Sequence, residues 1–149
     1  MTELLLLLHA AATWGLVGLI WVVQLVQYPG FSRVGSPDFG PYHEHHCARI
    51  TWVVAPLMAG ELLTGLALLL ERPPGLSLAS LGLGLGLLAL NWATTAFVFV
   101  PLHGRLRPLS AELGRLVTWN WVRTACWTAR GAWILVVLLE QWPEAIPTT

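Results

Sequence analysis

Long apolar runs separated by short polar breaks divide the chain into four segments. Hydrophobic residues dominate residues 3–28, 42–70, 76–100 and 110–142. With a rise of about 1.5 Å per residue, a helix over any of these ranges is long enough to cross a hydrocarbon core about 30 Å thick. The pattern therefore predicts an all-α protein, an integral membrane four-helix bundle that forms a single transmembrane domain over residues 1–149.

Helix breakers set the expected ends of these segments. The ERPPG stretch at residues 71–75 stops the second helix, because consecutive prolines cannot continue it and glycine suits the exit. Pro101 is expected to end the third helix, and Ser110 is a suitable N-cap for the fourth. Pro56 lies inside the second helix and predicts a kink near Trp52, whose carbonyl loses its usual donor.

Composition places the chain in a membrane. Of the 149 residues, 56% are hydrophobic, 11% are charged and none is lysine, and the mean hydropathy is +0.66. A soluble domain of this size needs more polar surface. The formal net charge of zero argues against a nucleic-acid partner. The first segment starts with an acidic residue and runs beyond a signal-peptide core, so we expect a retained helix.

Arginines near the segment ends predict the orientation. Arg33 and Arg49 flank one connection, and Arg105 and Arg107 lie in another, whereas the opposite side has only Arg72. The positive-inside rule then places both arginine-rich connections in the cytoplasm and both termini outside (N-out, C-out), as in a multi-pass protein of the bacterial inner membrane. The same rule brings the histidines of the two connections to one side.

Polar side chains inside the segments predict the interior of the bundle, because they are costly to expose to lipid. Glu61 and Arg123 are expected to pair across two helices, while Arg130, nearer a helix end, is expected to snorkel outward. His9 is expected to be isolated. The polar cluster should open to the cytoplasmic side, and its other members are Asn91, Thr94, Thr95 and Asn120.

Metal-ligating residue types are concentrated in one stretch, PYHEHHCAR at residues 41–49. His43 and His46 share a helical face, and His103 can reach them from the other cytoplasmic connection, which makes these three candidate ligands of a metal or haem. The spacing fits no standard zinc signature, so an interfacial loop that is merely solvated is the alternative. The cofactor stays open between iron, copper, haem and none.

Tryptophans and glycines complete the set of candidate contact residues. Trp92, Trp119 and Trp127 accompany the polar residues and are candidate walls for a flat apolar ligand, although aromatic residues also fill bundle cores without binding anything. Gly82 and Gly86 share one face of the third helix, where small residues allow close helix approach. This face leaves room for a homodimer.

Three further motifs carry a family resemblance. YPGF near the end of the first segment, VPLHGRL at residues 100–106 and LVTWNWVRTACW at residues 116–127 together resemble small four-helix bacterial membrane proteins related to the anthrone oxygenases. In that family a proline-leucine-polar motif follows the third helix, and a W-N-x-x-R-T motif lies in the fourth. Here His103 stands where asparagine is common. The resemblance implies oxygenation of activated phenolic compounds, in some members without a metal.

These observations lead to one main hypothesis, a membrane oxidoreductase acting on a small hydrophobic compound, aromatic or quinone-like. Asn120 and Arg123 would hold a substrate oxyanion, His103 would act as base or metal ligand, and Glu61 would complete the catalytic set. Asn91 joins the tryptophans as a candidate substrate contact.

The alternative is a binding or transport protein for a small hydrophobic molecule or a metal ion, with Glu61 and Arg123 as a gate. A scaffold whose polar groups only fix helix register is a third reading.

Overall fold

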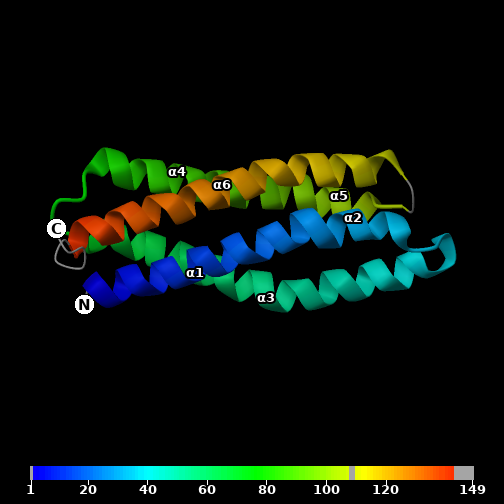
Figure 1. Ribbon diagram of the computed structural model, residues 1–149, viewed down its shortest axis with the longest axis horizontal. Coiled ribbons are helices and arrows are strands. Elements are labelled where there is room, and N and C mark those ends of the chain that lie inside the picture. Colours follow the sequence, from blue (N-terminus) through cyan, green and yellow to red (C-terminus); the bar gives the residue numbers. More distant parts are fainter. Residues whose placement is uncertain (1, 108–109, 143–149) are drawn as a thin grey trace, which may run out of the picture.

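The computed structural model describes residues 2–107 and 110–142, and every regular element in these ranges is helical. Four helical stretches are long and apolar enough to cross a membrane: Thr2–Arg33, Ser36–Leu70, Leu78–Arg105 and Ala111–Gln141. They run up and down in one elongated bundle, so that the starts of the first and third stretches lie at the same end as the finishes of the second and fourth (Figure 1). The all-α fold with four spanning-length helices is confirmed.

The first stretch is composed of four consecutive elements. Helix α1 (Thr2–Val22) passes into a π-helical turn, η1 (Val23–Gln27), then into the short α2 (Tyr28–Gly30) and the 3₁₀ turn η2 (Phe31–Arg33). The third stretch repeats this design with α4 (Leu78–Thr94), the π-helical turn η3 (Thr95–Phe99) and α5 (Val100–Arg105). The other two stretches are single helices, α3 (Ser36–Leu70) and α6 (Ala111–Gln141).

Each π-helical turn ends two residues before a proline. The amide of Tyr28, the residue before Pro29, bonds to the carbonyl of Val23. The amide of Val100, the residue before Pro101, bonds to the carbonyl of Thr95 in the same way. A proline ring clashes with the carbonyl four residues earlier, and a wider turn is one way to relieve that clash without ending the helix. The prediction that Pro101 ends the third helix is therefore wrong.

The observed ends of the first helix and the start of the second also differ from the predicted ones. The first helical stretch continues past residue 28 to Arg33, and α3 begins at Ser36 rather than near residue 42, so the histidine stretch is helical. Proline at the first turn suits a helix start, and Pro37 occupies that place in α3. For α6, Ser110 is the N-cap residue as expected, but its hydroxyl donates to the carbonyl of Arg107 instead of capping an amide.

Packing among the helices is uneven. Helix α1 packs against α3 and α6, and α4 packs against α6, whereas α3 and α4 make few contacts. Gly84 permits the close approach of α4 and α6, because a Cβ there would meet the Trp133 ring at 2.8 Å. Gly82 and Gly86 are exposed and face open space. The sparse contact between α3 and α4 is where the interior becomes accessible.

Candidate functional site

A cavity of about 340 Å³ lies between the four helical stretches. Its walls are mostly aliphatic and aromatic, and all four stretches contribute, including both π-helical turns through Val23, Thr95 and Phe99. Four lining residues are exposed on the outer surface: Thr51 and Ala55 of α3, Trp92 of α4 and Val100 of α5. The cavity thus reaches the surface between α3 and the third stretch, on the side of the bundle.

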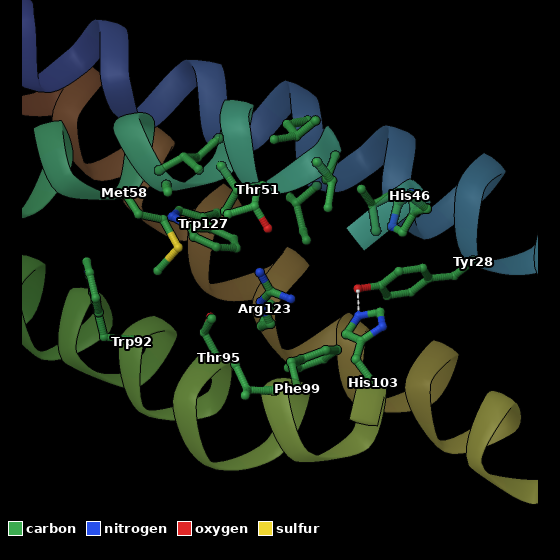
Figure 2. Close-up of a pocket in the computed structure, with 18 residues that line it drawn as sticks. Tyr28, His46, Thr51, Met58, Trp92, Thr95, Phe99, His103, Arg123 and Trp127 are labelled. Carbon is green, nitrogen blue, oxygen red and sulfur yellow. Dashed lines mark hydrogen bonds between the residues drawn. The ribbon is translucent and has the colours of Figure 1, made fainter. Parts of the chain in front are cut away.

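Arg123 projects into this cavity from α6 (Figure 2). Its side chain is buried, and its guanidinium carbon lies 4.3 Å from the centroid of the Phe99 ring and 5.0 Å from that of the Trp127 ring. Nε has no hydrogen-bond partner, and within residues 2–107 and 110–142 no carboxylate forms an ion pair with this arginine. Cation–π contacts hold the guanidinium in place, and its charge has no counter-ion in the part of the chain that the structure describes.

Tyr28 and His103 form a second polar group in the cavity, next to Arg123. The Tyr28 hydroxyl lies 3.1 Å from Nε2 of His103, and both side chains line the cavity (Figure 2). Tyr28 is buried, at the start of α2 directly after the π-helical turn. His46 also lines the cavity, and its ring packs edge-on against Phe31 with centroids 5.1 Å apart.

Three potential metal ligands meet beside the cavity. Nε2 of His43, Sγ of Cys47 and Nδ1 of His103 lie within 4.8 Å of one another, and all three residues are half-buried. His43 and Cys47 are four residues apart on α3 and therefore share a face, while His103 comes from α5. His43 and His103 were predicted together, but the third member is Cys47 rather than His46, which lies outside this group.

The predicted pair of Glu61 and Arg123 does not form. Glu61 is fully buried and its Oε1 lies 2.8 Å from Nε of Arg130, so Arg130 is the partner and does not snorkel outward. Oε1 also accepts from Thr13, and Oε2 accepts from Nε1 of Trp127 at 3.1 Å. Glu61 is not among the residues that line the cavity.

His9 belongs to the same buried network, so the expectation that it is isolated is wrong. Arg130 donates from Nη2 to Nε2 of His9 at 3.2 Å, and Nδ1 of His9 lies 2.8 Å from the Thr64 hydroxyl. Arg130 further donates from Nη1 to the carbonyl of Gly84. These bonds tie α1, α3, α4 and α6 together at one level of the bundle.

The remaining predicted contact residues occupy different places. Trp127 is buried and Trp92 partly exposed, and both line the cavity, whereas Trp119 is 47% exposed and does not. The Asn120 amide donates to Oε1 of Gln24, and Nε2 of Gln24 donates to the carbonyl of Val117. Asn120 does not line the cavity and supports the π-helical turn η1 through Gln24. Asn91 is fully buried and does not line the cavity, and among the described residues neither polar atom of its amide has a hydrogen-bond partner.

Sequence reasoning missed Tyr28 and Cys47 as site residues, and both had a signal. Cys47 follows His43 by four residues within the histidine stretch, and Tyr28 begins the YPGF motif. In comparisons with known proteins, no family model, curated protein or solved structure matches the chain.

Proposed function

We propose that this chain is a bacterial inner-membrane enzyme that oxidises a small, flat, hydrophobic compound carrying one oxygen function, such as a phenol or an anthrone. The observation that carries the proposal is Arg123, a buried cation in a mostly apolar cavity that has no carboxylate partner among residues 2–107 and 110–142. A buried charge is costly unless it is paired, and a ligand oxyanion would supply the missing partner. Hydrogen bonds to such an anion are strongest in a dry site.

The neighbouring Tyr28 and His103 supply proton transfer. Their hydrogen bond of 3.1 Å allows the pair to take up or release one proton next to Arg123 in the cavity. For an anthrone-like substrate, the pair would remove a proton from the activated CH₂ group, and Arg123 would hold the resulting enolate oxygen. Molecular oxygen then converts the CH₂ group to C=O, with water as the second product.

The cavity walls fit a substrate that arrives through lipid. The exposed lining residues lie on the side of the bundle, and Trp92 and Trp127 provide flat apolar walls. This agrees with the resemblance to the anthrone oxygenases, whose W-N-x-x-R-T motif contains Arg123. Asn120 bonds to Gln24, so in this proposal Arg123 binds the oxyanion without it.

Oxidation of anthrone by the protein in lipid nanodiscs tests the proposal. We expect oxygen uptake and anthraquinone formation in a one-to-one ratio, with rates above those of empty nanodiscs. Uptake equal to that of empty nanodiscs would refute the oxidase reading for this substrate class. Retention of a tracer inside proteoliposomes separates the transport alternative, because an enzyme should move nothing across the membrane.

A further inference from the structure

The donor group of His43, Cys47 and His103 has the dimensions of a metal site. Nε2 of His43 lies 2.9 Å from Nδ1 of His103, and Sγ of Cys47 lies 3.4 Å and 3.8 Å from these two nitrogens. Around a tetrahedral zinc ion with bonds of about 2.0–2.1 Å to nitrogen and about 2.3 Å to sulfur, such donors are about 3.4 Å (N to N) and about 3.6 Å (N to S) apart. Shifts of a few tenths of an ångström would therefore suffice to bind one ion.

The same distances disfavour a haem held between the two histidines. Axial imidazole nitrogens on opposite sides of one iron are about 4 Å apart, if each bond is about 2.0 Å long as for other imidazole–metal bonds. Here the two nitrogens are 2.9 Å apart, and the Cys47 sulfur lies close to both. Two imidazoles and one thiolate on one side of an ion are instead donor types that zinc accepts, and copper binds the same set in blue-copper sites.

Each imidazole is held in place by surrounding groups. The second nitrogen of His103, Nε2, bonds to the Tyr28 hydroxyl, as metal-ligating histidines usually bond through their free nitrogen. The His43 ring stacks on Phe39 at an interplanar angle of 5°, with centroids 5.7 Å apart. Phe31, which is 1% exposed, packs edge-on against the His43 ring. The donor nitrogens of the two rings are therefore aimed at each other by aromatic packing and an outer hydrogen bond.

We propose that His43 Nε2, Cys47 Sγ and His103 Nδ1 bind a single zinc-class ion. Three protein ligands leave a fourth position for water or a ligand atom, as in catalytic rather than structural zinc sites. Metal on Nδ1 leaves the proton of His103 on Nε2, where it is donated to the Tyr28 oxygen, so that with the ion bound the oxygen of a deprotonated Tyr28 would be the group of this pair that takes up a substrate proton. The metal site itself does not depend on the proposed oxidation.

Zinc content of the purified protein tests this assignment without any substrate. After equilibration with Zn²⁺ and removal of excess metal, we expect one zinc per chain in the unmodified protein and in the controls His45→Ala and Cys126→Ser. His45 is exposed in the same stretch, and Cys126 is the other thiol. The His46→Ala variant should also keep its zinc, whereas Cys47→Ser and His43→Ala should lose it. Zinc below stoichiometry in the unmodified protein, or retained in Cys47→Ser, would overturn the assignment.

Cobalt substitution and one conservative variant guard against loss of folding. Bound Co²⁺ should give a sulfur-to-metal charge-transfer band that is absent in Cys47→Ser, with circular dichroism unchanged between the two proteins. Tyr28→Phe removes only a hydroxyl and should weaken zinc binding by about 10- to 100-fold, the usual effect of removing an outer-shell partner. A cobalt spectrum without the sulfur band, or unchanged affinity in Tyr28→Phe, would contradict the geometry described. Anthrone oxidation can fail while zinc binds, and zinc binding can fail while anthrone is oxidised, so the two proposals are refuted separately.

Discussion

At the scale of single residues, the central feature is the contrast between two buried arginines on one helix face. Arg130 has a carboxylate, an imidazole and a carbonyl as partners, whereas Arg123 has two aromatic rings and the cavity. The first arrangement satisfies the charge within the protein. The second leaves it for a ligand, which is why these arginines are expected to respond differently to substitution.

Substituting Arg123→Gln should slow anthrone oxidation by about 10²- to 10³-fold, the usual effect of removing one donor to a developing oxyanion. Arg115→Gln is the matched control, because Arg115 is exposed on the same helix α6. Initial rates of oxygen uptake measure both variants. Equal rates for Arg123→Gln and the unmodified protein would remove this arginine from the mechanism.

Substituting Glu61→Ala should lower the unfolding free energy by about 3–5 kcal/mol, because it leaves the buried Arg130 charge without its partner. Glu140→Ala, at an exposed position of α6, should have little effect. Thermal unfolding in detergent, followed by circular dichroism, compares the variants. A Glu61→Ala protein as stable as Glu140→Ala would contradict the role of this network in holding the bundle together.

At the scale of helices, the sequence was sufficient for the number and type of elements but not for their ends. Apolar run lengths predicted four helices, whereas Pro29 and Pro101 were ambiguous, because a proline either ends a helix or is accommodated by a π-helical turn. The choice depends on tertiary packing, and here both turns line the cavity.

The partner of Glu61 was predictable from helix geometry. Glu61 lies nine residues before the end of α3 and Arg130 eleven before the end of α6, while Arg123 lies eighteen before it. Because these two helix ends lie at one end of the bundle, Glu61 and Arg130 share a depth at about 1.5 Å per residue. The contacts of Arg123 with Phe99 and of Tyr28 with His103 were not predictable in this way, since they depend on the π-helical turns.

Two glycines of α4 provide a prediction at this scale. Gly84→Ala should destabilise the protein by about 1–3 kcal/mol, because the new methyl group overlaps the Trp133 ring. Gly82→Ala meets nothing within 4 Å and should be neutral or slightly stabilising, since alanine favours helix more than glycine. Thermal unfolding of the two variants gives the comparison. If Gly82→Ala instead lowers stability and shifts the particle to a smaller mass, the face of Gly82 and Gly86 is a dimer contact.

At the scale of the whole molecule, the proposed enzyme is defined by the cavity and by its opening on the side of the bundle. The cavity opens between α3 and the third helical stretch, and α3 and α4 make few contacts with each other. Substituting Ala55→Trp, at the exposed rim, should block substrate arriving from lipid and reduce anthrone oxidation while zinc content stays unchanged. Ala93→Trp, exposed on α4 outside the cavity lining, is the control. Equal rates in the two variants would exclude the lateral route.

Binding of a ligand in the cavity tests the proposed role of Arg123 directly. Anthraquinone, the expected product, should quench the fluorescence of Trp92 and Trp127, which line the cavity, when added to the protein in nanodiscs. We expect saturable binding of one molecule per chain, weakened about 10- to 100-fold by Arg123→Gln through loss of a hydrogen bond from a charged donor, and unchanged by Arg115→Gln. Quenching that rises without saturation, or that is the same in all three proteins, would mean that the compound only partitions into lipid and that the cavity does not bind it.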